Sequence, residues 1–368
     1  MIANIANMNE NFASIIVFSI ILILLIMMGI NMYSMINLES STCNHMDKLY
    51  PTVNGKIRPI SLNTKDEQLG YTLKDYYIKS AYNSCSGGKY KNNVVNVCNL
   101  IDIIKQGVRC FDFEIYSLND TPIVSTSIES SYFIKETYNS VDFGSVMSTL
   151  QNYAYSSSTC PNPNDPIILH LRIKSKNQKM YTAFAEILKT YDGLMLGPNY
   201  SFENNGKNLG NVKLLDLVGK IILIVEKDNT AFMENIAFYE YVNMTSNSVF
   251  MRAIKYYDVK FTPDMNELIE YNKQNMTLVK PDVGANPPNC SAILTREMGC
   301  QMVCMRYQLD DNFLKEDMAF FDSCGYAFCL KPANLRYIPV VIADPPPPNP
   351  ALSYAPRHIE KDYYKIKI

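Results

Sequence analysis

Residues 94–116 read VVNVCNLIDIIKQGVRCFDFEIY, and within them a helical pattern gives way to a strand pattern. From Val94 to Lys105 the apolar residues recur at helical spacing, and Gly107 follows as a typical helix stop. From Val108 to Tyr116 apolar and polar residues alternate, which is the period of a half-buried β-strand. A helix followed directly by a strand indicates an α/β fold.

The same alternation of helix and strand patterns starts at about Leu69 and continues along the chain. It predicts either an α/β barrel or a doubly wound sheet. The sequence contains neither GxGxxG nor GxxxxGKS/T, so the usual nucleotide-binding fingerprints are missing. Further strands are predicted at Pro122–Ser125, Pro166–Ile173, Lys220–Glu226 and Gly299–Tyr307, and a helix at Lys179–Tyr191.

Composition excludes two broad classes of protein. The 368 residues carry 34 Lys and Arg against 36 Asp and Glu, a net charge of −2, so we expect no nucleic-acid partner. Hydrophobic residues make up 47% and charged residues 19%, which excludes disorder for most of the length. A mechanism that needs two imidazoles in one pocket has few candidates, because the only histidines are His45, His170 and His358.

The N-terminal region contains a long apolar segment. Residues 12–30 (FASIIVFSIILILLIMMGI) carry no charge, and as a helix they would span about 28 Å, close to the hydrocarbon core of a bilayer. The run is too long for a cleaved signal peptide and lacks the polar face of a core helix. We therefore expect an uncleaved transmembrane helix in contact with the lipid bilayer. Its orientation is unreadable because no Lys or Arg precedes Lys48.

The other boundaries follow from composition. Residues 1–11 form a short N-terminal flank, and residues 31–69, rich in Ser, Asn, Thr and Pro, are expected to be a tether from the membrane to the domain. The alternating body is placed at residues 70–343. The run DPPPPNP then opens a Pro-rich segment and a mixed-charge tail at residues 344–368.

Cysteine and asparagine patterns leave the cellular compartment open. The ten cysteines form no CxxC pair and no zinc-ligand set, and we expect buried thiols slightly in preference to disulfides. Asn-x-Ser/Thr sequons also occur, although an Asn-rich chain produces such triplets by chance. They begin at Asn119, Asn199, Asn243, Asn275 and Asn289.

Six strings in this body resemble the catalytic barrel of the phosphoinositide-specific phospholipase C family. LKDYYIKSAYNSCSGG, IKQGVRCFDFEIY, TPIVSTS, DPIILHLRIKS and LLDLVGKIILIVEK are similar, in order, to its first half. GCQMVCMRYQLDDNFLKEDMAFFDSCGYAFCLKPANLR is similar to the end of its second half. The resemblance implies a distorted TIM-like (β/α)8 barrel with its site at the C-terminal ends of the strands.

The resemblance also implies which positions should carry the chemistry. The family cleaves a phosphodiester with two histidines, one acting as general base and the other as general acid. Tyr82, followed by Asn83, stands at the place of the first histidine, and Thr126 stands at the place of the second. Neither side chain exchanges a proton near neutral pH as imidazole does, so we expect the acid–base pair to be lost. His170, inside a predicted strand, is interpreted as a structural histidine.

The family's calcium ligands fall on Asn83, Asp112 and Glu114, which keep oxygen donors. Asp112 and Glu114 share one face of their strand. The fourth ligand, a glutamate in the family, is replaced by Arg172. We therefore expect an internal ion pair in preference to bound calcium, and no other cofactor.

The family's positions for binding inositol phosphates are altered as well. A Lys-x-Lys pair is replaced by Ile224 and Glu226. A Ser-Arg-Ile-Tyr run falls on residues 277–280, with Leu278 and Lys280 at its second and fourth places. Because phosphorylated inositol needs cationic partners, these changes remove most of the expected headgroup contacts.

These losses predict a membrane-anchored pseudoenzyme that acts as a structural or interaction module with protein partners. The alternative is a divergent phosphatidylinositol-type phosphoric diester hydrolase, with Tyr82 or the pair Asp112 and Glu114 as base. The bias toward Asn, Ile, Tyr and Met resembles that of an AT-rich protist or a large DNA virus. Together with the anchor, it leads to the further hypothesis of a virion membrane component.

Overall fold

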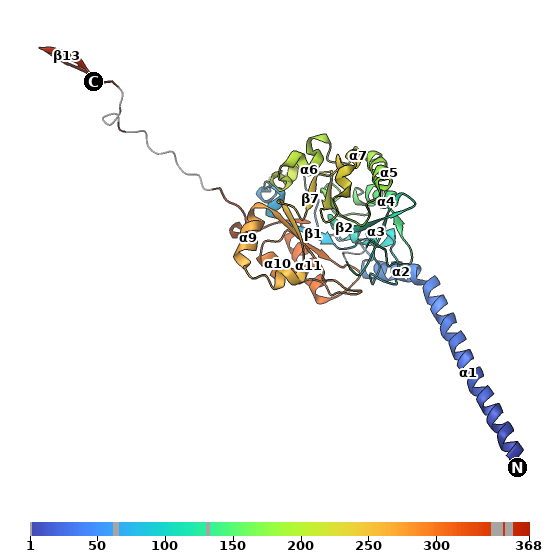
Figure 1. Ribbon diagram of the computed structural model, residues 1–368. Helices are drawn as coiled ribbons and strands as arrows, with labels where there is room; N and C mark the ends of the chain where they lie inside the picture. Colours follow the sequence, from blue (N-terminus) through green and yellow to red (C-terminus); the bar gives the residue numbers. More distant parts are fainter. Residues whose placement is uncertain (1, 62–65, 130–132, 340–348, 350–355) are drawn as a thin grey trace. The chain divides into compact units, whose positions relative to one another are not determined.

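Eight parallel strands form the centre of the larger of two units, Met1–Tyr337, in this computed structural model (Figure 1). The structure describes residues 2–61, 66–129, 133–339, 349 and 356–368. The hydrogen-bonded order is β7-β6-β5-β2-β1-β10-β9-β8, and β7 also contacts β8, so the barrel is nearly closed. The predicted TIM-like barrel is confirmed, and a doubly wound sheet is excluded. The strands are β1 (Tyr76–Ala81), β2 (Cys110–Leu118), β5 (Ile167–Ile173), β6 (Ile221–Glu226), β7 (Met244–Ser246), β8 (Met251–Lys255), β9 (Met276–Lys280) and β10 (Met302–Met305).

Three short antiparallel strands extend this barrel. β3 (Thr121–Ser125) pairs with β2 through a tight hairpin, and β4 (Val141–Asp142) pairs with β3. β11 (Phe328–Leu330) pairs with β1. The hairpin of β2 and β3 carries Ser125 and the residues after it to the C-terminal end of the barrel, beside Glu114.

Helices surround the strands, as Figure 1 shows. The helix predicted at Val94–Lys105 begins at Val97 because the Asn96 side chain caps it by accepting from the Cys98 backbone N–H. The strand predicted at Gly299–Tyr307 is shorter, since only β10 pairs with its neighbours. The helices are α3 (Val97–Lys105), α4 (Phe143–Thr149), α5 (Gln178–Lys189), α6 (Ser201–Gly206), α7 (Ile236–Tyr239), α8 (Tyr256–Lys260), α9 (Met265–Gln274), α10 (Ala292–Glu297) and α11 (Asn312–Cys324).

Alternate residues of each strand face the helices and the barrel interior. On β2, Phe111, Phe113 and Ile115 pack in the apolar cluster with the surrounding helices. The interior has two layers. Its lower layer, toward the N-terminal ends of the strands, is apolar and includes Cys110, Ile168, Ile222, Ile224, Met244, Met251, Met276, Leu278 and Met302. Its upper layer is polar and contains the site described below.

Part of the segment predicted to be a tether is packed onto the barrel. It contains α2 (Leu38–Leu49), which buries Met46 and is joined to α3 by the disulfide Cys43–Cys98. Beyond α2, the Tyr50 hydroxyl donates to the Tyr307 carbonyl at 2.7 Å. A linker pattern of Ser, Asn and Thr therefore concealed a docked helix, because the burial of a single methionine is not a periodic signal.

The expectation of free thiols is wrong for four of the ten cysteines. Cys43–Cys98 and Cys324–Cys329 are disulfides. The other six cysteines are free and buried, as expected. Pairing depends on which cysteines the fold brings together, and spacing along the chain does not contain that information.

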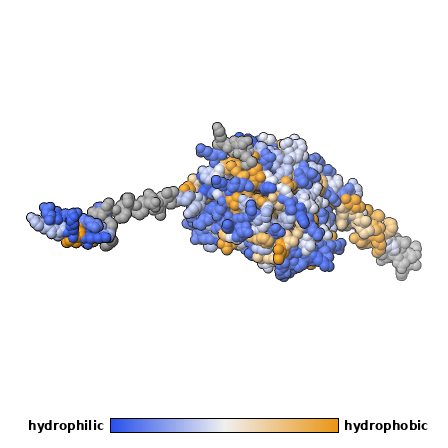
Figure 2. Space-filling view, turned by 90° about the horizontal axis from the view of Figure 1, so that it is seen from above, coloured by the Kyte–Doolittle hydropathy of each residue, from blue (hydrophilic) through white to orange (hydrophobic). Residues whose placement is uncertain are grey.

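The N-terminal helix α1 runs from Ile2 to Ile36. Its part Ser14–Ile36 is long and apolar enough to cross a membrane, with a mean hydropathy of 2.8, and none of its residues is buried. On the face seen in Figure 2 the side chains of this part are apolar, whereas most of the barrel surface is hydrophilic. Whether a bilayer surrounds this helix stays a prediction.

The second unit, Ile338–Ile368, contains an antiparallel hairpin of β12 (His358–Lys361) and β13 (Tyr364–Lys367). The end of the mixed-charge tail therefore forms a β-hairpin. The proline run predicted to stiffen this region lies outside the described residues, apart from Asn349.

Candidate functional site

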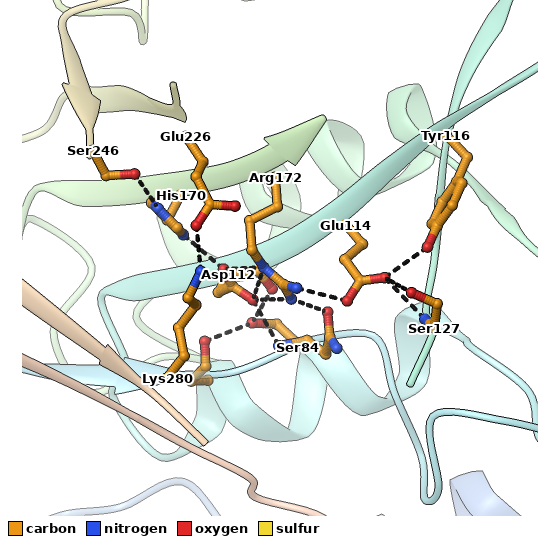
Figure 3. Close-up of polar contacts among 12 residues, drawn as sticks. Ser84, Asp112, Glu114, Tyr116, Ser127, His170, Arg172, Glu226, Ser246 and Lys280 are labelled. Carbon is orange, nitrogen blue, oxygen red and sulfur yellow. Dashed lines mark hydrogen bonds and ion pairs between the residues drawn. The ribbon is translucent and has the colours of Figure 1, made fainter. Parts of the chain in front are cut away.

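Charged and polar side chains converge in the upper layer of the barrel (Figure 3). The register of β2 and β5 places Asp112 opposite His170 and Glu114 opposite Arg172. The two residues on each strand are two positions apart and therefore point to the same side, so all four side chains enter the interior. Glu226 at the end of β6 and Lys280 at the end of β9 extend the same layer.

Arg172 lies at the centre of the predicted metal position. Its Nη2 donates to Asp112 Oδ1 at 2.6 Å and to Asn83 Oδ1 at 2.7 Å, and its Nη1 donates to Glu114 Oε1 at 2.6 Å. Its Nε donates to both carboxylate oxygens of Asp112, at 3.0 and 3.2 Å. The structure therefore brings together all four residues of the predicted degenerate site.

The remaining oxygens of these carboxylates also have donors. Glu114 Oε2 accepts from the Ser127 backbone N–H at 2.9 Å and from the Tyr116 hydroxyl at 2.8 Å. Burial opposes ionisation of Asp112, but attraction by Arg172 and hydrogen bonds from His170 and Arg172 outweigh it and hold the pKa of this carboxyl well below its usual range. Asp112 is thus a buried carboxylate anion whose charge is compensated by Arg172.

This donor set does not fit calcium. A calcium ion takes six to eight oxygen ligands, whereas here the oxygens of Asn83, Asp112 and Glu114 that face one another already accept from the guanidinium. A second cation at this position would be repelled by the fixed charge of Arg172. In the described part of the chain, no cluster of three or more His, Cys, Asp or Glu side chains has the geometry of a metal site.

His170 belongs to the same network. Its Nδ1 lies 2.7 Å from Asp112 Oδ2, and its Nε2 lies 2.9 Å from the Ser246 hydroxyl. Since Asp112 is ionised, Nδ1 carries a proton and donates it to Asp112, and Nε2 shares a hydrogen bond with the Ser246 hydroxyl. The order carboxylate, imidazole, hydroxyl is that of a hydrolase triad, but all three side chains are 0% exposed, so no substrate reaches the hydroxyl.

The two predicted positions of the family's histidines, Tyr82 and Thr126, both make contacts within the fold. The Tyr82 ring stacks on the guanidinium of Arg172, with the Arg172 Cζ 4.5 Å from the ring centroid. Burial raises the pKa of Tyr82 well above its usual value, so the phenol stays protonated at neutral pH. Thr126 donates its hydroxyl to the Tyr90 carbonyl at 2.9 Å. The Tyr82 ring is therefore held against Arg172, and the Thr126 hydroxyl is engaged by a backbone carbonyl.

The positions of the family's headgroup contacts are used within the barrel. Ile224 and Leu278 face the interior and belong to its apolar lower layer. Glu226 and Lys280 form a buried ion pair with each other. Burial disfavours the anion of Glu226, but Lys280, His170 and Arg172 together lower its pKa below the usual value. The one remaining lysine of the predicted headgroup positions is therefore neutralised internally.

Little space is left at this end of the barrel. The cavity between Tyr82, Glu114 and Lys280 has a volume of about 20 Å³, which is room for about one water molecule. Small-molecule sites usually measure at least about 300 Å³. A cavity of that size, about 310 Å³, lies at Leu196 and Tyr241, before β6 and β7, and contains none of the predicted site residues.

Sequence reasoning interpreted His170 as a structural histidine without predicting its partners, and it did not single out Ser246. The alternation of PIILHLRI put His170 and Arg172 on one face, which was a usable signal for His170. Ser246 had no comparable signal because β7 has only three residues.

A nearly closed parallel barrel with its polar residues at the C-terminal ends of the strands defines the class of TIM-like barrel proteins. Within this class, residues 69–227 match the model of the family "Phosphatidylinositol-specific phospholipase C, X domain". No curated protein is significantly similar to the sequence.

Two solved structures are similar in fold. PLC21 of S. officinalis is 17% identical with a TM-score of 0.58, and the match covers 75% of this chain and 39% of that one. PLC21 of L. pealei is 17% identical with a TM-score of 0.59, and the match covers 76% of this chain and 39% of that one. The chain thus spans about two fifths of the length of these structures, and at this identity the likeness concerns the fold.

Proposed function

We propose that the chain is a membrane-anchored, phospholipase-C-like pseudoenzyme whose barrel acts as a structural or interaction module. The observation that carries this proposal is the position of Arg172, whose guanidinium binds Asn83, Asp112 and Glu114 at the family's metal position. A phosphodiesterase of this family needs a cation that the substrate can share. The charge of Arg172 is instead consumed by two buried carboxylates.

The loss of acid–base groups supports the same proposal. A general base must lie within hydrogen-bond reach of the substrate and have a pKa near the working pH. The phenol of Tyr82 has a raised pKa, and the carboxylate of Asp112 has a lowered one and is hydrogen-bonded on both oxygens. A cavity of about 20 Å³ leaves no room for an inositol phosphate.

One observation favours the alternative, a divergent phosphatidylinositol-type phosphoric diester hydrolase. His170 sits between Asp112 and Ser246, so an oriented imidazole is present in the upper layer. Catalysis would require the loops above the barrel to open and expose it, because its side chain is 0% exposed. The compensated charges of the layer favour the pseudoenzyme.

Inositol phosphate release from phosphatidylinositol vesicles tests the choice. We expect the full-length chain in detergent to release none, with or without calcium. Release that disappears in Asp112→Asn and persists in the matched control Asp362→Asn, an exposed carboxylate in the tail, would establish the enzyme instead.

The anchor is tested separately. We expect the full chain to resist carbonate extraction from membranes, and a chain that lacks residues 1–36 to be released. That the membrane belongs to a virion stays a prediction, which rests on composition and on the apolar N-terminal segment.

A further inference from the structure

The ten cysteines divide sharply by exposure. Partly exposed cysteines are all paired, in the disulfides Cys43–Cys98 and Cys324–Cys329. Buried cysteines are all free thiols, and none of their side chains is more than 1% exposed; they are Cys85, Cys110, Cys160, Cys290, Cys300 and Cys304. No thiol of this chain is therefore open to solvent.

This division is what an oxidising compartment selects. There an accessible thiol is oxidised or mispaired, whereas a thiol that water cannot reach stays reduced. Burial raises the pKa of the Cys85 and Cys300 thiols, to about 12 for Cys300, so the reactive thiolate is suppressed as well. In a reducing cytosol these four cysteines would stay as free thiols, so placing them within bonding distance in two pairs would not stabilise the fold.

The five sequons also differ in the exposure of their asparagines. Asn119 is exposed at the tip of the β2–β3 hairpin, and Asn199 is exposed in the turn before α6. Their side-chain amides make no hydrogen bond to the described residues. By contrast, Asn243 is buried and accepts from the Leu223 backbone N–H at 2.8 Å, and Asn289 is buried and accepts from the Arg306 backbone N–H at 2.6 Å.

The fifth sequon is also engaged with the fold. Asn275 is half-buried and accepts from the Asn208 amide at 3.2 Å. A glycan is attached to the amide nitrogen Nδ2, which in Asn243 donates to the Tyr200 carbonyl at 3.0 Å and in Asn289 donates to the Arg306 carbonyl at 3.3 Å. A glycan at either residue would break these bonds inside the fold, and at Asn275 it would crowd the Asn208 amide that contacts this side chain. Only two of the five sequons are therefore compatible with the folded barrel carrying a bulky sugar.

We propose that the barrel lies on the oxidising, extracytoplasmic side of its membrane and carries N-linked glycans at Asn119 and Asn199. The acceptor amide nitrogen forms a bond to C1 of a lipid-pyrophosphate-linked oligosaccharide. The bond from C1 to the pyrophosphate breaks, the lipid pyrophosphate leaves, and the amide loses one proton. Each disulfide forms as two thiols give two electrons and two protons to a thiol oxidant of that compartment.

The proposal does not depend on the fate of α1. An uncleaved anchor with its N-terminus in the cytosol and a cleaved leader both deliver the following residues to the extracytoplasmic side. Flanking charge does not decide the matter, since no Lys or Arg precedes Lys48. The cysteines and sequons therefore predict on which side of the membrane the barrel lies, which the sequence of the apolar segment does not.

The test is expression of the full chain in cells that perform N-glycosylation, followed by digestion with an endoglycosidase. We expect a mobility shift of two glycans. Thr121→Ala and Ser201→Ala should each remove one, and the double variant both, because each change destroys a sequon and leaves its asparagine in place. The matched changes Thr121→Ser and Ser201→Thr keep the sequons and should keep the glycans.

Thiol counting is the second measurement. Cells are lysed into denaturant with a maleimide reagent, and we expect six labelled cysteines before reduction and ten after it. An unshifted wild-type chain, or a shift that survives in the double variant, would overturn the glycan sites. Ten labelled cysteines without reduction would overturn the placement of the barrel.

Discussion

The two layers of the barrel interior differ in what holds them together. The lower layer is closed by apolar side chains such as Ile168, Leu278 and Met302, which contribute by leaving water. The upper layer is equally inaccessible but consists of charges, with Asp112, Glu114 and Glu226 opposite Arg172 and Lys280. A barrel interior can thus be filled as completely by ion pairs as by hydrocarbon. Such charges then serve the fold and are not available to a substrate.

The largest effect is expected from removing the central cation. Arg172→Met leaves two carboxylates buried without their partner, so we expect the free energy of unfolding to fall by about 4 kcal/mol. Urea unfolding of the full chain measures it. The control is Arg252→Met, which breaks the exposed pair with Glu267 and should cost under about 1 kcal/mol. Equal losses in the two variants would mean that the upper layer is not held by its charges.

A slightly smaller effect is expected in the lower layer. Leu278→Ala opens a cavity in the apolar interior, and we expect a loss of about 3 kcal/mol in the free energy of unfolding. Because no charge is involved, the loss should be the same at pH 4 and pH 7. A loss that changes with pH would show that the two layers are coupled.

Calcium binding tests whether the charges of the upper layer occupy a former metal position. Arg172→Glu replaces the internal cation by a carboxylate, which is a fourth oxygen-donor residue and the third acidic one beside Asn83, Asp112 and Glu114. We expect calcium to raise the Tm of this variant, with a stabilisation of about 2.7 kcal/mol at a hundred times its Kd. Wild type and Arg172→Gln, which lacks the added carboxylate, should not respond. A wild-type response would contradict the conclusion that the donor set is occupied.

The smallest effect concerns acid. The pKa of Asp112 is lower in the folded chain than in the unfolded chain, so its contribution to stability is present above about pH 4 and is lost as the pH falls toward the folded value. We expect Asp112→Asn to lose roughly 1 kcal/mol less than wild type between pH 6 and pH 3, measured by urea midpoints. An identical acid slope in the two proteins would exclude Asp112 as the titrating group.

Much of the site could be predicted because it depends on local pattern. The period of two in VRCFDFEIY and PIILHLRI put Asp112, Glu114 and Arg172 on inward faces, and the resemblance placed them at one end of the barrel. What could not be predicted was their partners. His170 meets Ser246 across a separation of 76 residues, and Cys43 meets Cys98 across 55.

By itself, the sequence determined the strand and helix periods and the resemblance of the barrel to the phospholipase C family, and it led to the prediction that the family's histidines and cationic contacts are lost. Only the tertiary structure decided that Arg172 pairs with both Asp112 and Glu114, that α2 is docked and that the partly exposed cysteines are paired. The physical reason is that a period depends on neighbours along the chain. Charge compensation, pairing and burial depend on distances through space, which arise only when the strands close into a barrel.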